Sequence, residues 1–328
     1  MNEHLLFLDL GFMRIYWFGL FAGCAILTAA VLFCILRRLQ GERLSQALDA
    51  LLLSLPVGFI AARVSYCWFR QASFSGRASD YLHLSEGGFS LFGGLSGIAV
   101  MLLLFSARKR LSFLKLMDAA VPALSAAIAA GRFAGVTGGE ETGFEIKTDC
   151  SAPFVRWSET EQANVLWVGY FEGIFALIIT GMVLYLFFRK YIRKNAGLRE
   201  GCVTLCFMLT FGLSQAFLES MRSDSLFMVT LGFVRIDQII SILMAVAAFV
   251  IISIDNARVC GLSACRLSLW AICAAALALA VVCEFTLSAT YLAQIYTRMA
   301  ASLFVIWISG ILLFADTARN RYAAGTKA

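Results

Sequence analysis

Residues 16–36 read YWFGLFAGCAILTAAVLFCIL, and none of these 21 residues carries a charge. About 20 such residues cross the hydrocarbon core of a bilayer as one helix. A helix is required there because lipid offers the backbone no hydrogen-bond partner. Four more uncharged stretches of 17 to 19 residues occur along the chain: 87–105, 201–218, 267–283 and 299–315. These segments predict an integral membrane protein built from helices.

Four further apolar segments are each interrupted by a charge. Residues 50–69 contain Arg63, 118–133 end near Arg132, 165–188 contain Glu172 and 236–254 contain Asp237. The whole chain is 60% apolar and only 15% charged, which is too little polar surface for a soluble domain of 328 residues. The prediction is therefore an all-α integral membrane protein with about nine transmembrane helices.

The distribution of basic residues predicts the orientation. Lys and Arg gather on the cytoplasmic side of membrane proteins. With nine spans and the N-terminus outside, 17 of the 27 basic residues fall in cytoplasmic loops and the C-terminal tail. Residues 1–15 contain acidic Glu3 and Asp9, unlike the basic start of a cleavable signal peptide. The net charge of +6 then reflects topology and anionic inner-leaflet lipid, and nucleic acid is not an expected partner.

Cysteine and histidine do not form a metal-binding pattern. The ten cysteines lie mostly within the predicted spans, and the chain has only two histidines, His4 and His83. There is no CxxC motif and no Cys/His cluster, so we expect no metal site and no cofactor.

Three arginines lie in or at the outer ends of the predicted spans: Arg63, Arg132 and Arg222. Each of them alone is compatible with snorkelling of its side chain to the headgroup region. Four carboxylates lie at similar depth and are possible partners: Glu86, Glu140, Glu172 and Glu219. Because the planar guanidinium binds phosphate in a bidentate manner, the three arginines together suggest a phospholipid headgroup site.

A glycine-rich run opens the third predicted span. Residues 86–97 read EGGFSLFGGLSG, with five glycines. One interpretation is close helix packing through small residues, which is common in membranes. The other is a helix N-terminus with bare backbone N–H groups that face an anionic ligand.

At these residues the sequence resembles the phosphatidylglycerol–prolipoprotein diacylglyceryl transferases of bacteria, from about residue 16 to residue 254. The glycine run is similar to the family pattern EGGxSxHGGLxG. Four other motifs resemble those of the family, and all five occur along the chain in the family order. They are Ala62-Arg63-x-x-Tyr66, Asp118 to Pro122 with Arg132 and Gly139-Glu140, Glu219-x-x-Arg222, and Gln238-x-x-Ser241. The predicted spans at 267–283 and 299–315 lie beyond this core. We therefore expect a seven-span transferase-like domain over residues 1–258, followed by a two-span hairpin and cytoplasmic tail over residues 259–328.

The resemblance implies a chemistry. Family members transfer a diacylglyceryl group from phosphatidylglycerol to the lipobox cysteine of a prolipoprotein at the outer face of the cytoplasmic membrane, and glycerol phosphate leaves. The thiol needs deprotonation and the leaving phosphate needs positive charge. By position in the motifs, the expected catalytic residues are Arg132, Arg222 and Glu140. The expected substrate-binding residues are Arg63, Tyr66, Gly87, Gly88, Ser90, Gly93, Gly94, Glu219 and Gln238. The implied partners are phosphatidylglycerol, or another anionic phospholipid, and prolipoprotein signal peptides.

Several polar residues of the family pattern are replaced in this chain. Phe92 occupies the position of the family histidine, and Phe211 that of a tyrosine. Gln215 replaces an arginine, and Gly135 and Gly138 replace two asparagines. Two functions remain open at this point: a lipid transferase, or a relative that binds phospholipid without catalysis and assists envelope maturation. A transporter is disfavoured because no inverted repeat is apparent.

Overall fold

The computed structural model describes residues 6–9, 14–69, 88–138, 142–146, 154–158, 162–223, 235–287 and 292–325. Within these ranges nine helices are long and apolar enough to cross a membrane, which confirms the predicted all-α membrane fold. They are α1 (Trp17–Leu39), α2 (Leu44–Phe69), α4 (Leu91–Lys109), α5 (Phe113–Gly138), α6 (Val168–Phe187), α7 (Cys202–Glu219), α8 (Ile236–Cys260), α9 (Ala264–Phe285) and α10 (Leu292–Gly325). A π-helical turn, η4 (Phe188–Ile192), continues α6.

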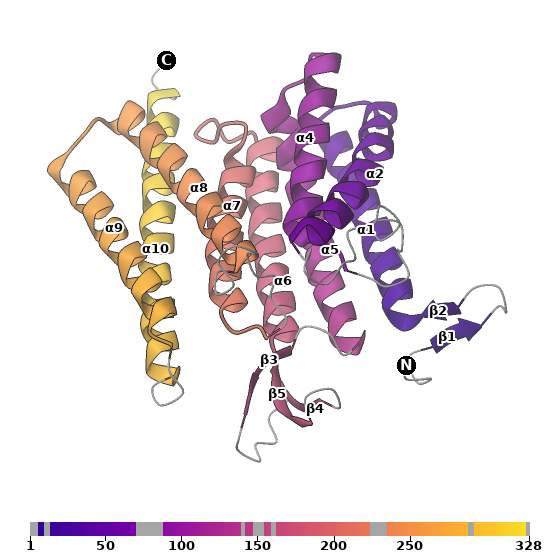
Figure 1. Cartoon of the computed structure of the whole chain (residues 1–328). Coiled ribbons are helices and arrows are strands. Elements are labelled where there is room, and N and C mark those ends of the chain that lie inside the picture. Colours follow the sequence, from indigo (N-terminus) through magenta and orange to yellow (C-terminus); the bar gives the residue numbers. More distant parts are fainter. Residues whose placement is uncertain are drawn as a thin grey trace.

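Two small antiparallel sheets accompany the helices. Strands β1 (Leu6–Asp9) and β2 (Arg14–Tyr16) pair just before α1. Strands β3 (Thr142–Glu145), β4 (Val155–Ser158) and β5 (Ala163–Trp167) form a sheet of order β3-β5-β4 within the long loop between α5 and α6. Figure 1 shows both sheets at the same end of the helices. Strands of three to five residues carry too little alternation to be predicted from the sequence.

The two ends of the helical bundle differ in charge. The C-terminal end of α10 lies opposite the sheets (Figure 1), as an odd number of spans requires. The turns that follow α1, α4, α6 and α8 lie at that same end and carry the basic residues of the predicted cytoplasmic loops. Ion pairs form there between Lys115 and Glu42 (2.7 Å) and between Arg199 and Asp255 (3.1 Å). The side of the membrane that each end faces stays a prediction.

Glycines allow α2 and α4 to pack in direct contact. A Cβ atom added at Gly93 would lie 2.6 Å from Cβ of Ser65, and one added at Gly97 would lie 2.5 Å from Cβ of Ala61. Larger residues at either position would separate the two helices. The glycine run therefore serves helix packing, which was one of its two interpretations.

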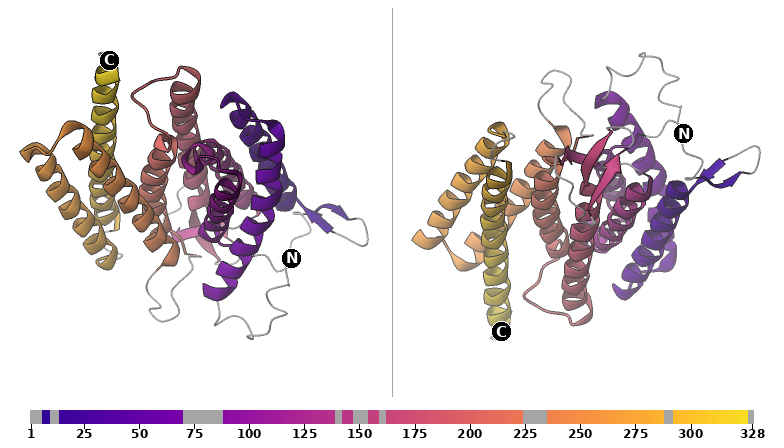
Figure 2. Two further views of the ribbon diagram at one scale, coloured as in Figure 1. Left: turned by 90° about the horizontal axis from the view of Figure 1, so that it is seen from above. Right: turned by 90° about the horizontal axis from the view of Figure 1, so that it is seen from below.

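Helix α7 connects two buried apolar clusters. One cluster joins α7 to α1, α2, α4, α5 and α6, and the other joins it to α8, α9 and α10. Figure 2 shows α9 and α10 beside α8 at one edge of the bundle. The predicted domain boundary at residue 258 falls in the last turn of α8, and the division itself stays a prediction.

The start of α7 is held by a buried carboxylate of α5. Asp118 has 0% exposure and accepts hydrogen bonds from the backbone N–H groups of Gly201 (2.8 Å) and Thr204 (2.9 Å). The hydroxyls of Thr204 and Tyr191 donate to it as well, at 2.8 and 2.9 Å. A carboxylate at this position satisfies helix-terminal N–H groups and interacts favourably with the helix dipole. Asp118, the first residue of the motif that runs from Asp118 to Pro122, therefore positions α7.

Candidate active site

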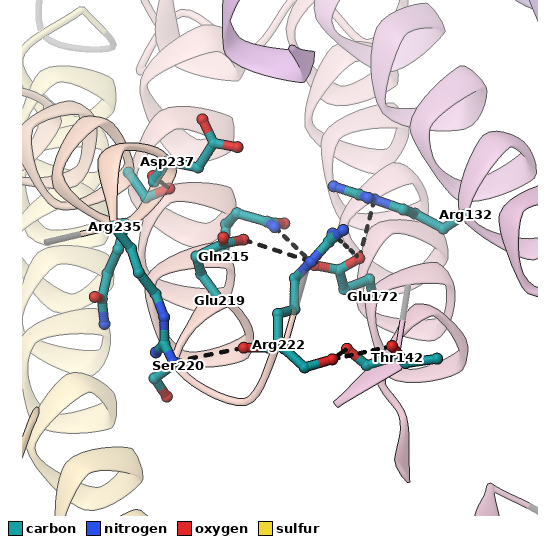
Figure 3. A network of polar contacts seen from close by, with 12 residues as sticks. Arg132, Thr142, Glu172, Gln215, Glu219, Ser220, Arg222, Arg235 and Asp237 are labelled. Carbon is teal, nitrogen blue, oxygen red and sulfur yellow. Dashed lines mark hydrogen bonds and ion pairs between the residues drawn. The ribbon is translucent and has the colours of Figure 1, made fainter. Parts of the chain in front are cut away.

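Glu172 of α6 is the centre of a buried polar network. Its side chain is 1% exposed and accepts from Nε of Arg132 at 3.1 Å. Nη1 of Arg222 lies 3.3 and 3.4 Å from its two oxygens, and Nε2 of Gln215 donates at 2.8 Å. Figure 3 shows the three donors reaching Glu172 from different elements. A buried carboxylate requires this pairing, because an uncompensated charge in a membrane interior is costly.

Two more carboxylates lie close to this network. Glu219, at the end of α7, is 2% exposed, and its Oε2 lies 3.9 Å from Nε of Arg222. Asp237, in the first turn of α8, interacts electrostatically with both arginines and both glutamates. Its Oδ1 is buried and has no hydrogen-bond partner within the described part of the chain. We call Arg132, Glu172, Gln215, Glu219 and Arg222 the arginine cluster.

Local structure explains how the two arginines meet. Arg132 lies in the C-terminal part of α5, and Arg222 lies in the turn after α7. Strand β3 fixes that turn: Ser223 N donates to the carbonyl of Thr142 at 3.0 Å, and Gly143 forms an isolated bridge with Arg222. A Cβ at Gly143 would lie 2.7 Å from the Met221 carbonyl oxygen, so only glycine permits this approach.

Arg63 occupies a separate position, at the entrance to α4. It is 3% exposed, and its Nη1 donates to the carbonyl of Gly88 at 3.1 Å. Its guanidinium lies 5.8 Å from the centre of the Phe89 ring. Gly88 has a φ of +81°, and an added Cβ would lie 2.2 Å from Cε1 of Tyr66. Arg63 and Tyr66 therefore shape the turn before α4.

Helix α4 begins later than the glycine run suggested. Its first residue is Leu91, and Ser90 is the N-cap, whose hydroxyl accepts from Gly93 N at 3.2 Å. The predicted anion site at bare N–H groups is thus partly occupied by Ser90. Two of the predicted site residues, Gly87 and Glu140, lie outside the described residues, and so does Glu86, which was named as a possible partner of the arginines.

An apolar cavity of about 400 Å³ lies between α1, α2, α4 and α5. Arg132 is the only charged residue among the described residues that line it. Phe89, Ser90 and Gly94 also line it, which connects the entrance of α4 to Arg132. Ala120 and Arg132 are both lining residues, and their separation along α5 corresponds to about 18 Å. The cavity therefore has an apolar interior long enough for a fatty acyl chain and a cation near the end of α5.

Two of the residues that replace family polar groups, Phe92 and Phe211, contact one another. Phe92 is 5% exposed, and its ring centroid lies 6.2 Å from that of Phe211, which stacks on Phe207 at 4.9 Å. The positions that the family pattern gives to histidine and tyrosine are thus joined here by an aromatic contact. Gln215, at the position of a family arginine, keeps a hydrogen bond to Glu172 but supplies no charge. Gly135 is buried in α5.

The structure groups only some of the predicted site residues. Arg132, Arg222 and Glu219 belong to the arginine cluster, whereas Gln238 donates to the carbonyl of Ala216 at 3.2 Å and links α8 to α7. Glu172 was expected only as a possible partner of the arginines and not as a site residue. The signal that identifies it is its charge in the middle of an apolar segment.

Comparison with known proteins identifies a family that matches most of the chain. The family model described as "Prolipoprotein diacylglyceryl transferase" matches residues 6–254. A phosphatidylglycerol–prolipoprotein diacylglyceryl transferase of Lactobacillus delbrueckii subsp. bulgaricus is 27% identical over 255 residues, covering 74% of this chain and 87% of the relative. Proteins of the same name from Lactococcus lactis subsp. cremoris (27%, 74% and 91%) and Bacillus cereus (28%, 75% and 89%) are similarly related.

Proposed function

The chain belongs to the prolipoprotein diacylglyceryl transferase family and is a multi-pass membrane protein. On this basis we propose which substrates it uses and which residues bind them. It transfers a diacylglyceryl group from phosphatidylglycerol to a prolipoprotein, as the names of its relatives describe for them. The acceptor on the prolipoprotein is the thiol of a cysteine. The observation that carries this proposal is the apolar cavity whose one charged lining residue within the described ranges is Arg132. Such a cavity suits a lipid whose acyl chain is buried and whose phosphate remains near a cation.

The two arginines bind the phosphate in this proposal. Arg132 and Arg222 converge on the carboxylate of Glu172, at 3.1 and 3.3 Å, so both guanidinium groups already face a common anion. A phosphate that enters next to Glu172 binds to the same two cations. As the bond to the glyceryl carbon breaks, the added negative charge on the leaving phosphate is stabilised by groups that are already in position.

The bonds formed and broken in the proposed reaction are all bonds of the thiol and the phospholipid. The thiolate sulfur bonds to the glyceryl carbon, and the bond between that carbon and the phosphate ester oxygen breaks with its electron pair on the oxygen. Glycerol phosphate leaves, and the thiol proton passes to water or to the phosphate. Phe92 offers no imidazole for this proton, and the carboxylates of Glu172 and Glu219 are already engaged in ion pairs with arginine. We expect turnover to be slower than in relatives that carry the histidine.

The site faces the outer leaflet in this proposal, with the N-terminus outside and the C-terminus in the cytoplasm. That orientation places the arginine cluster and the sheet of β3, β4 and β5 at the outer end. A prolipoprotein signal peptide spans the same bilayer and presents its cysteine at that surface, so donor and acceptor meet at one depth.

Purified protein, phosphatidylglycerol and a lipobox peptide provide the test, with glycerol phosphate release as the readout. We expect release in the wild type and its loss in Arg132→Gln and Arg222→Gln. Arg266→Gln is the matched control, because Arg266 pairs with Asp316 (3.2 Å) at the opposite end of the bundle. Lipid binding without any glycerol phosphate release would contradict the proposal and favour a non-catalytic lipid-binding relative. Complementation of a strain depleted of its own transferase gives an independent answer.

A further inference from the structure

Helices α9 and α10 lie beyond residue 254, where the match to the family ends. We call this pair the C-terminal hairpin. It packs on α7 and α8 through the second apolar cluster, which includes Leu209, Ala245 and Met299. Packing alone would explain its presence. Two polar interactions, however, connect the hairpin to the turn of residues 220–223, which contains Arg222.

The first contact is made by Tyr296 of α10. Its hydroxyl donates to the carbonyl of Ser220 at 2.9 Å, in a buried position. Its ring stacks on Phe144 of β3 at 5.9 Å and meets Phe217 of α7 edge-on at 6.1 Å. Because the ring is fixed from two sides, the hydroxyl is held at the backbone of the turn.

The second contact runs through Arg235, the residue before α8. Its Nη1 forms an ion pair with Oε1 of Glu284, near the end of α9, at 3.1 Å. Its Nη2 lies 3.5 Å from the carbonyl oxygen of Arg222 and donates to it. Figure 3 shows Arg235 next to Ser220 and Arg222. Glu284 thus orients the donor that contacts the backbone of Arg222 itself.

The turn of residues 220–223 is therefore fixed from two directions. Strand β3 holds it through Ser223 and the bridge at Gly143. The hairpin holds it through Tyr296 and, by way of Arg235, through Glu284. The side chain of Arg222 leaves this turn toward Glu172, with which it forms an ion pair at 3.3 Å.

We propose that the C-terminal hairpin is a positioning element for the lipid-phosphate site, in which Tyr296 and Glu284 set the position of Arg222. The inference rests on the proposed function, since it takes Arg222 to bind the phosphate. Arginine has many rotatable bonds, and its backbone here lies in a turn rather than in a helix. Rigid support of the backbone preorganises the guanidinium, and small displacements of a binding group reduce affinity and rate.

Single-atom variants separate positioning from fold stability. Tyr296→Phe removes only the hydroxyl, and Glu284→Gln keeps the shape of the side chain but removes its charge. Each should weaken binding of short-chain phosphatidylglycerol to the purified protein by about threefold to tenfold, the size of coupling usual between contacting groups. Arg266→Gln is the control, because it breaks the ion pair with Asp316 (3.2 Å) at the other end of the same hairpin. It should change thermal stability to a similar extent and leave lipid affinity unchanged.

A double-variant cycle identifies the route of the effect. In an Arg222→Gln background, Tyr296→Phe should cause no further loss of affinity, because the group that it positions is absent. A full additional loss there would overturn the inference, and so would affinities of Tyr296→Phe and Glu284→Gln equal to that of Arg266→Gln. If Arg132→Gln and Arg222→Gln still weaken binding in that case, the proposed phosphate site is supported without the role of the hairpin. Unchanged binding in these two arginine variants would overturn both proposals.

Discussion

The charges of a few side chains decide how strongly the arginine cluster binds an anion. Arg132 and Arg222 provide two positive charges, while Glu172, Glu219 and Asp237 provide three negative ones close by. The family pattern has a further arginine where this chain has Gln215. The site is therefore less positive than the pattern implies, although the two guanidinium groups still face one point.

Asp237→Asn tests this charge balance. The substitution removes a negative charge that interacts with both arginines and keeps the size of the side chain. We expect affinity for phosphatidylglycerol to rise by about threefold to tenfold at low salt and the gain to shrink at high salt. Asp255→Asn, at the other end of α8, is the control for loss of a carboxylate from this helix. Equal affinities of Asp237→Asn and the wild type would show that Asp237 does not affect the bound headgroup.

Phe92 and Phe211 form a second residue-scale test. The side chain of Phe92 is 5% exposed, and its ring neighbour Phe211 offers no hydrogen-bond partner. Phe92→His alone should therefore destabilise the protein by about 2 kcal/mol, the cost of burying a polar group without a partner. Adding Phe211→Tyr supplies a hydroxyl beside the imidazole and should recover much of the loss. Thermal unfolding in detergent measures both effects. A stable single variant would show that the imidazole finds another partner.

Among the secondary-structure elements, α4 and α7 are positioned by contacts at their N-termini. Helix α4 begins at Leu91 because Ser90 caps it, and because Gly88 makes a turn with positive φ against the ring of Tyr66. Helix α7 begins at Cys202 because Asp118 accepts the N–H groups of its first turn. Two of the motifs that carry the family resemblance thus act by positioning helices around the site.

Asp118→Ala should destabilise the fold. The change removes the acceptor for the backbone N–H groups of Gly201 and Thr204 and for the hydroxyl of Thr204, which are buried, and for the hydroxyl of Tyr191, which is partly buried. The expected loss is about 3 kcal/mol, seen as a lower unfolding temperature. Asp49→Ala is the control, because the ion pair of Asp49 with Lys109, at 3.9 Å, is half-exposed. That variant should change stability by less than about 0.5 kcal/mol. Similar unfolding temperatures for the two variants would contradict the capping role.

At the scale of the whole molecule, nine helices among the described residues place the sheets and the end of α10 at opposite ends. The basic turns then lie together at one end and the arginine cluster lies at the other. This separation agrees with the preference of Lys and Arg for the cytoplasmic side. In the predicted orientation, the proposed phosphate site lies at the outer leaflet.

Reporter fusions test this orientation. A reporter fused after Lys327 should be active only in its cytoplasmic form. A reporter inserted in the loop between α9 and α10 should be active only in its periplasmic form, because α9 and α10 each cross the membrane once. Periplasmic activity after Lys327 would reject the predicted orientation. Cytoplasmic activity of both fusions would show that the hairpin does not span the membrane.

The membrane fold, the number of helices and the family could all be predicted from the amino-acid sequence. Each of these depends on local properties: the length of an apolar segment, the position of a charge along it, and the order of short motifs. A bilayer accepts only segments that satisfy their own backbone hydrogen bonds, so residues 16–36 predict a helix without reference to the rest of the chain. Position along the apolar segments also identified Arg132, Arg222 and Glu172 as charged residues whose place in or beside a membrane span requires a binding partner or a function.

Which of these charged side chains are in contact could be learned only from the three-dimensional structure. It groups Arg132, Arg222 and Gln215 around Glu172 and leaves Arg63 at the entrance of α4. It also brings Tyr296 of the C-terminal hairpin to the carbonyl of Ser220, 76 positions away in the chain. Sequence spacing states which residues share a face of one helix, whereas contacts between helices depend on how close two backbones can approach. That distance is set by packing across the bundle, as at Gly97 and Ala61, and no single segment encodes it.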